Sequence, residues 1–228
     1  MMKEYSLIVA AMDEEMNALL NLLPNLNKLS ICNEELYEFE MNNQLYLLGR
    51  GKIGKVHTAV YLTKLFEELN IKRVFNIGTS GGVDSSLKIS DVVIATKVAY
   101  HDVDVTGFNY ELGQMCGCPT YYECDSEYID SKKIDSKYTI KKGLIVSGDQ
   151  FVTRNNLYSS NILKFEGVVA CDMEASAVGH VCYLYKIPFV VVRSISDIVT
   201  KEENSKSFDE NLNLSSTNSA LVLLELIK

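Results

Sequence analysis

Carboxylic acids and one arginine lie directly after an apolar, strand-like run of this sequence. The run Phe189–Val192 ends at Arg193, and Asp197 follows shortly after it. An uninterrupted apolar run after a proline is typical of a strand buried on both faces of a parallel sheet. Ligands of open α/β sheets bind at the carboxyl ends of such strands. We therefore expect Arg193 and Asp197 at a strand exit, either as an ion pair or helix cap in a loop or as part of a site.

A second acidic group, Asp13, Glu14 and Glu15, follows the apolar run 5–11. Acids in the first turn of a helix are favoured by the helix dipole, which accounts for Asp13 and Glu14. Glu15 precedes Leu19 by four residues and so stands at the edge of the buried stripe, where a carboxylate can act as a general base towards water. Carboxylates at a strand exit would also repel free phosphate unless cations compensated. This favours a neutral substrate or a water nucleophile.

Two further clusters follow strand-like runs. The glycine-rich segment 76–82 is predicted to be a turn, either purely structural or one whose amides and Thr79 hydroxyl approach a ligand. Its spacing matches neither the P-loop nor the dinucleotide-binding pattern. Asp172 and Glu174 lie where a strand is expected to enter a helix, a common place for acids. Paired carboxylates are also what a site needs to hold two vicinal sugar hydroxyls.

The elements that must position these residues alternate along the chain. Strands are expected at 5–11, 45–48, 74–77, 91–96, 143–146, 168–171 and 189–192. Apolar residues at three- and four-residue spacing predict helices at 13–23, 55–69, 173–185 and 215–227. The pattern predicts a single three-layer α/β domain over residues 1–228, with a mixed central β-sheet flanked by helices. The segment 101–126 has weak periodicity and is expected to be a long excursion, as binding loops and subunit contacts often are.

The composition excludes several classes of partner. A net charge of −8 over 228 residues disfavours nucleic acid and anionic membranes. Neither a signal peptide nor a membrane-spanning run is evident, so a cytoplasmic protein is expected. Cys116, Cys118 and Cys124 form the only possible metal cluster, but their spacing lacks the paired motif of zinc sites. Free thiols and a site without a metal are therefore expected.

Short motifs along nearly the whole chain carry a resemblance to a known family. They lie at 11–16, 53–56, 78–82, 100–106, 113–114, 143–149, 172–175, 193–197 and 207–209. In this order and spacing they resemble the 5′-methylthioadenosine/S-adenosylhomocysteine nucleosidases of the purine nucleoside phosphorylase fold. The resemblance implies hydrolysis of the N-glycosidic bond of these two nucleosides, and of 5′-deoxyadenosine, without a cofactor. The products would be adenine and the corresponding ribose, a 5-thioribose for the two thio-nucleosides.

The resemblance also implies roles for individual residues. Glu15 would activate water, Asp197 would protonate adenine N7, and Glu174 would hold the ribose hydroxyls with Met173 packed on the sugar. Phe151 would stack on adenine and Val152 would read its edge. The other substrate contacts would line the sugar and base sites, orient the water or form an apolar 5′ pocket, and they are Thr79, Gly81, Asp172, Arg193, Ser196, Met12, Ile53 and Phe208.

By the same resemblance the protein would be a homodimer whose loop 101–119 reaches the neighbouring site through Val105 and Phe108, with Tyr110 beside them. Two alternatives stay open. A phosphorylase of the same fold would use phosphate as the nucleophile, and Arg50 and Lys52 add positive charge where the family often has Ser-Gly. A non-catalytic adenosine-binding protein would need the base and sugar contacts but not two acids in acid–base roles.

Overall fold

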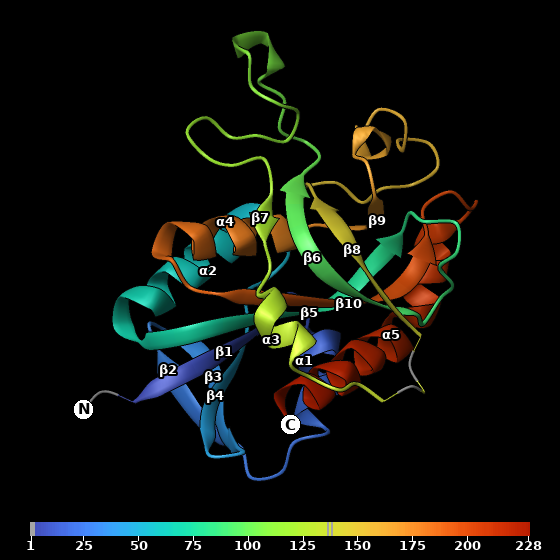
Figure 1. Ribbon diagram of the computed structural model, residues 1–228. Coiled ribbons are helices and arrows are strands. Elements are labelled where there is room, and N and C mark those ends of the chain that lie inside the picture. The colour runs from blue at the N-terminus through green and yellow to red at the C-terminus, as the bar shows by residue number, and fades with distance from the viewer. Residues whose placement is uncertain (1–2, 136, 138) are drawn as a thin grey trace.

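The computed structural model describes residues 3–135, 137 and 139–228, and a large mixed β-sheet dominates this part of the chain (Figure 1). The sheet has ten strands in the order β10-β6-β8-β9-β5-β1-β4-β3-β2, with β7 paired to β6. The strands are β1 (Glu4–Ala10), β2 (Asn27–Ile31), β3 (Glu34–Met41), β4 (Gln44–Arg50), β5 (Asn70–Gly82), β6 (Val92–Tyr100), β7 (Tyr122–Glu123), β8 (Ile140–Ser147), β9 (Val168–Asp172) and β10 (Phe189–Ile198).

One half of the sheet closes on itself. β10 pairs with β6 on one side and with β5 on the other, and β6, β8, β9 and β5 complete the circuit. The strand β5 belongs to both halves, because its first part pairs with β1 and its last residues, Gly81 and Gly82, pair with β9. Asp197 lies opposite Gly81 in the β10–β5 register, with a shift after Ile195. The ends of β1, β5, β9 and β10 are thereby brought to one region.

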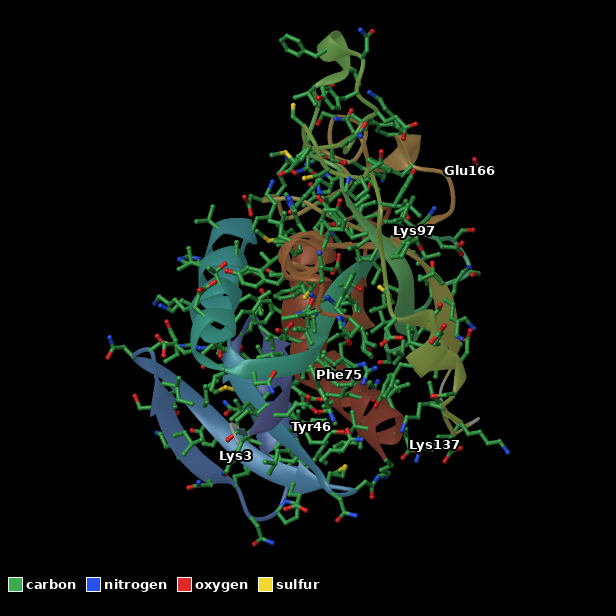
Figure 2. The ribbon with its side chains drawn as sticks, turned by 60° about the vertical axis from the view of Figure 1, so that its left-hand side comes forward. Lys3, Tyr46, Phe75, Lys97, Lys137 and Glu166 are labelled. Carbon is green, nitrogen blue, oxygen red and sulfur yellow. The ribbon has the colours of Figure 1, made fainter. Side chains whose placement is uncertain are left out.

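Helices cover both faces of the sheet. They are α1 (Asp13–Leu20), α2 (Lys55–Glu68), α3 (Ser126–Asp130), α4 (Ala175–Tyr185) and α5 (Asn204–Ile227). α1 and α5 pack together on one side and α2 and α4 on the other (Figure 1), which confirms the predicted three layers. Between the layers lies an apolar core that includes Tyr46 and Phe75, whose ring centroids are 6.4 Å apart (Figure 2). Among the described residues, none of the helices is both long and apolar enough to cross a membrane.

Two sequence predictions about strand ends are wrong. β10 continues through Ile198, so Arg193 lies inside the strand and not at its exit. The segment 76–82 is likewise the last part of β5 and not a turn. Both strands continue past their apolar runs because each supplies the other with backbone partners as far as Gly82. Their polar side chains can be buried there because they bind one another.

Other boundaries also differ from the predictions. α4 begins at Ala175 instead of residue 173, and α5 begins at Asn204, well before the predicted residue 215. The strands β2, β3 and β7 were not predicted. β7 has only two residues, and the β2–β3 hairpin at the sheet edge mixes apolar with polar residues and lacks the continuous apolar run by which the other strands were recognised. The long excursion after β6 is present and projects from the body at the top of both views (Figures 1 and 2).

Candidate active site

A cavity of about 200 Å³ opens where β1, β5, β9 and β10 end. Thirteen of the residues predicted to form the site line it: Met12, Glu15, Ile53, Thr79, Gly81, Phe151, Val152, Asp172, Met173, Glu174, Ser196, Asp197 and Phe208. Ala11, Ser80, Gln150, Cys171 and Val199 also line it and were not predicted as site residues. The tertiary structure therefore brings together residues from seven separate segments of the chain.

Glu15 is held rigidly at the base of the cavity. It is the third residue of α1 and is 4% exposed, more deeply buried than its place at the edge of the apolar stripe predicted. Its Oε2 accepts hydrogen bonds from the backbone N–H groups of Ala11 and Met12 at 3.0 and 3.1 Å. Its Oε1 accepts from the N–H and the hydroxyl of Thr79 at 2.9 and 3.2 Å. The carboxylate is thus fixed between the start of α1 and the strand β5.

A space beside Gly78 is bordered by both an acceptor and a donor. A Cβ at Gly78, where φ is +153°, would lie 2.5 Å from Oε1 of Glu15 and 2.8 Å from Nη1 of Arg193. Only glycine is compatible with this close approach and this backbone angle. Nη1 of Arg193 is buried and has no hydrogen-bond partner among the described residues. A water molecule needs two or more polar partners, and these two groups could supply them.

Arg193 lies beneath the cavity in a buried ion pair. Its Nε and Nη2 donate to Oδ2 of Asp172 at 2.8 and 2.6 Å, and Nη2 also donates to Oδ1 of Asn76 at 2.7 Å. The carboxylate of Asp172 accepts further bonds from the Ser147 hydroxyl and the Ala175 N–H. Because these partners occupy Asp172, the geometry does not favour the predicted sharing of sugar hydroxyls with Glu174. Its observed contacts instead orient Arg193 and the start of α4.

Glu174 is the acid that remains directed at the cavity. It is 8% exposed, and its Oε1 accepts a hydrogen bond of 2.8 Å from the N–H of Gly54. Nη2 of Arg193 lies 3.8 Å from Oε2. Burial, reinforced by repulsion from Asp172, raises the pKa of Glu174 to about 8, although Arg193 and the Gly54 N–H act in the opposite direction. The raised pKa favours the protonated form of this carboxyl group in the ligand-free protein.

A group of charged residues, Lys55, Asp102 and Asp149, fixes the helix start that carries Gly54. Oδ1 of Asp149 accepts from the backbone N–H of Lys55 at 2.9 Å, and the Lys55 ammonium donates to Oδ2 of Asp102 at 2.6 Å. The Asp149 N–H donates to the same Asp102 oxygen. Three motifs of the sequence thus meet at the N-terminus of α2 and hold it beside Glu174.

Asp197 lies across the cavity and is 2% exposed. Its Oδ2 accepts from the side-chain amide of Asn204 at 2.7 Å, and the Ser196 hydroxyl lies 3.0 Å from its Oδ1. Burial raises the pKa of Asp197, and the hydrogen bonds from Asn204 and Ser196 reduce this increase. A carboxyl whose pKa is raised is suited to donate a proton near neutral pH.

Apolar side chains form the mouth of the cavity. Phe151 and Phe208 meet edge to face with ring centroids 5.6 Å apart, and Ile53 and Phe151 are 46% and 41% exposed. Met12 also lines this part. Exposed apolar groups at a cavity mouth are suited to bind an apolar substituent of a ligand.

Three predicted site residues do not line the cavity. Arg193 lies beneath it, as described above, and Val105 and Phe108 are in the projecting segment, where Phe108 is 78% exposed. The prediction also assigned no role to Asn76 and Asn204, which bind Arg193 and Asp197. Asn76 was part of a recognised motif, but Asn204 lies before the helix that the apolar spacing indicated. Neither Arg50, which pairs with Asp13 at 2.8 Å, nor Lys52 lines the cavity.

The raised pKa of Glu174 predicts a pH-dependent stability. The folded protein holds this proton until about pH 8, whereas the unfolded chain releases it near the usual value of 4.5. The free energy of unfolding should therefore fall as pH rises from 5 to 8. We expect Glu174→Gln to abolish the part of this fall that comes from Glu174. The difference in free energy of unfolding between the variant and the wild-type protein should therefore shift by about 2–4 kcal/mol in favour of the variant between pH 5 and pH 8.

Urea unfolding of the ligand-free protein at several pH values measures this difference. Glu127→Gln, at an exposed glutamate of α3, is the matched control and should leave the pH dependence unchanged. The prediction would be contradicted if the free energy of unfolding changed equally with pH in the wild-type protein and in Glu174→Gln between pH 5 and 8.

Comparison with known proteins places this geometry in a family. The family model described as Phosphorylase superfamily matches residues 6–228. A 5′-methylthioadenosine/S-adenosylhomocysteine nucleosidase from Exiguobacterium sp. is 39% identical over 225 residues, which cover 97% of this chain and 96% of that protein.

Solved structures agree with this relationship. The nucleosidase of the same name from Neisseria meningitidis, in complex with methylthio-immucillin-A, is 34% identical with a TM-score of 0.91, and the match covers 98% of each chain. The Streptococcus pneumoniae nucleosidase in complex with 8-aminoadenine is 33% identical with a TM-score of 0.90, covering 100% of this chain and 99% of that one. The resemblance inferred from the sequence motifs is confirmed, and the chain belongs to the phosphorylase superfamily and, within it, to the family of 5′-methylthioadenosine/S-adenosylhomocysteine nucleosidases.

Proposed function

We propose that this protein hydrolyses the N-glycosidic bond of 5′-methylthioadenosine and S-adenosylhomocysteine, releasing adenine and the 5-thioribose product. The observation that carries the proposal is the kind of ionisable side chain that lines the cavity. Four carboxyl groups line it, those of Glu15, Asp172, Glu174 and Asp197, and none of its lining residues in the described part of the chain is a lysine or arginine. Because these lining residues include no cationic side chain, they are poorly suited to hold a phosphate dianion and suit a neutral nucleoside and a water nucleophile instead.

The proposed mechanism assigns one proton transfer to each of two acids. Glu15 accepts a proton from the water that attacks C1′, and Nη1 of Arg193 helps to orient that water. Asp197 donates a proton to N7 of adenine as the bond between C1′ and N9 breaks, so that its electron pair leaves with the base. Glu174 binds the ribose hydroxyls, whose hydrogen bonds strengthen as positive charge develops on the ring. Burial separates these groups from bulk solvent, apart from the attacking water, and so strengthens each of these interactions.

The aromatic and apolar residues account for the substrate class. Phe151 and Phe208 offer faces and edges for a purine and for the sulfur substituent, and Met12 and Ile53 extend the apolar surface. The nucleosidase from Neisseria meningitidis binds methylthio-immucillin-A in its solved structure, which supports a methylthio-nucleoside as the ligand of this chain too. The relative rates for the two thio-nucleosides and for 5′-deoxyadenosine depend on how this surface fits each substituent.

A phosphate-free assay tests the function against its nearest rival. We expect adenine to be released from methylthioadenosine at a rate that does not change when phosphate is added. A rate that rises from near zero in proportion to phosphate would instead identify a phosphorylase. Tight binding of methylthioadenosine without adenine release over hours would identify a binding protein. Chromatography of adenine and of the sugar product distinguishes the three outcomes.

We further propose that the protein acts as a homodimer in which the segment 101–119 of one subunit completes the cavity of the other. Large apolar side chains are exposed on this segment and on α2, as expected of a subunit interface: Phe108 at 78%, Met115 at 41%, Val56 at 72% and Val60 at 50%. The family resemblance supports the same arrangement. The cytoplasmic location and the single domain expected from the sequence stay predictions.

Substitution of Phe108 tests the contribution of this segment. We expect Phe108→Ala to raise KM for methylthioadenosine by about 10- to 100-fold, because burial of an aromatic side chain against the ligand is worth about 1.5–3 kcal/mol. kcat should change little, since no proton transfer involves Phe108. Steady-state kinetics measures KM and kcat, and sedimentation velocity shows whether the wild-type protein and the variant are dimers.

Tyr158→Ala is the matched control, because Tyr158 is 81% exposed and lies in a different segment. A monomeric protein with full activity, or equal KM values for the two variants, would contradict the proposal.

A further inference from the structure

Asn204 is a buried side chain that touches the proposed catalytic acid but has no role in the mechanism described so far. It is 2% exposed and is the first residue of α5. Its Nδ2 donates to Oδ2 of Asp197 at 2.7 Å and to the backbone carbonyl of Val152 at 2.8 Å. One amide group thus joins the acid to the backbone that lines the base site.

The chemistry of the partners fixes which way the amide points. The carbonyl of Val152 can only accept a hydrogen bond, so the nitrogen of the Asn204 amide must face it. The same nitrogen carries a second hydrogen, which points at Oδ2 of Asp197. Oδ2 is therefore presented with a donor and serves as an acceptor. A proton on Oδ2 would face the N–H hydrogen of Asn204, and the two hydrogens would repel each other.

The other oxygen of Asp197 has a partner that can accept. Oδ1 lies 3.0 Å from the hydroxyl of Ser196, and that hydroxyl lies 3.3 Å from the carbonyl of Ser80. A hydroxyl has a single hydrogen. When Ser196 donates it to Ser80, its oxygen is free to accept a hydrogen bond from a protonated Oδ1. The two oxygens of the Asp197 carboxyl group therefore differ, because Oδ2 faces a donor and Oδ1 faces a group that can accept a hydrogen bond.

We propose that Asn204 is a positioning residue for the catalytic acid: its amide keeps Oδ2 of Asp197 as an acceptor, so that Oδ1 carries the proton to be transferred. This inference rests on the proposed function, because it needs Asp197 to act as an acid. It adds that the start of α5 sets both the orientation of the carboxyl group and the pH range in which the acid works. The other titratable groups lining the cavity are Cys171, Asp172, Glu174 and Glu15.

Asn204→Ala, with Asn204→Ser as a second variant, tests the proposal. Loss of the donor frees the carboxyl group to rotate, and we expect kcat for methylthioadenosine to fall by about 10- to 100-fold. KM should change little. The hydrogen bond from Asn204 opposes the effect of burial on the Asp197 pKa, so its loss should raise that pKa further. The high-pH limb of the kcat profile, where kcat falls as the acid loses its proton, should therefore move to higher pH. A purely structural role would not move this limb.

Asn211→Ala is the matched control, since Asn211 is a partly buried asparagine of the same helix whose amide donates to the Ser207 carbonyl. It should leave kcat and the pH profile unchanged. Circular dichroism and thermal unfolding show whether each variant is folded at the assay temperature, and Asn204→Ser provides the test if Asn204→Ala is not.

The outcomes separate this inference from the proposed function. If the wild-type protein releases adenine without phosphate but folded Asn204 variants keep their kcat, or lose it with no shift of the high-pH limb, the positioning role is overturned. If the wild-type protein releases adenine only with phosphate, or not at all, the proposed function itself fails. A loss of kcat with a shifted limb supports the inference.

Discussion

Asp197→Asn is expected to lower kcat for methylthioadenosine by about 10²- to 10⁴-fold, the contribution typical of a general acid. The amide has nearly the shape of the carboxyl group but cannot give up a proton to N7, so adenine would have to leave as an anion. Substrate binding should persist, because Glu174 and the aromatic residues are unchanged. Single-turnover measurement of adenine release, together with calorimetric titration of the intact nucleoside, separates the chemical step from binding.

Asp130→Asn is the control for this experiment. Asp130, the last residue of α3, forms an exposed ion pair with Lys142 of β8 and does not line the cavity. Exposed pairs of this kind contribute about 0–1 kcal/mol to stability, so the control should retain full activity. Near-normal turnover by Asp197→Asn would remove Asp197 from the role of acid and, with it, the positioning role of Asn204.

Glu15→Gln is expected to lower kcat by a similar factor of about 10²–10⁴, because Oε1 of Glu15 is the atom nearest to the space beside Gly78 and would accept the proton of the attacking water. This substitution should also reduce stability. Both oxygens of Glu15 accept from N–H groups, so the amide nitrogen of glutamine faces a donor in either orientation. Leaving buried donors unpaired costs about 1–3 kcal/mol.

The two effects of Glu15→Gln are measured separately. Urea unfolding gives the loss of stability, and adenine release is then measured under conditions where the variant is fully folded. Glu14→Gln is the control, since Glu14 lies in the same helical turn but does not line the cavity. A folded Glu15→Gln protein with wild-type kcat would show that another group activates the water.

The acids of the site could be predicted from the sequence because each lies next to a pattern with a physical meaning. Glu15 stands beside the apolar stripe of a helix, Asp172 and Glu174 flank a helix start, and Asp197 follows a buried run. The order and spacing of motifs along nearly the whole chain, some of which contain these acids, were specific enough to indicate the family. The α/β class followed from the alternation of apolar runs with helical periodicity.

The supporting residues could not be predicted, because their roles depend on contacts between distant segments. Asn204 is a polar residue in a polar stretch, and only the packing of α5 against β10 brings its amide to Asp197. The ion pair of Arg193 with Asp172 depends in the same way on the pairing of β10 with β5 and of β9 with β5. Hydrogen bonds of this kind have no periodicity along the chain.

The sequence by itself determined which residues are available for proton transfer and for binding a purine nucleoside, because these residues can be recognised from local patterns and motifs along the chain. Only the tertiary structure decided how they are used. Closure of the sheet through β5 and β10 places Arg193 beneath the cavity instead of at a strand exit, turns Asp172 towards that arginine and leaves Glu174 free for the ligand. The reason is that burial removes water from these groups, so each must bind a partner that the fold, and not its neighbours in the chain, supplies.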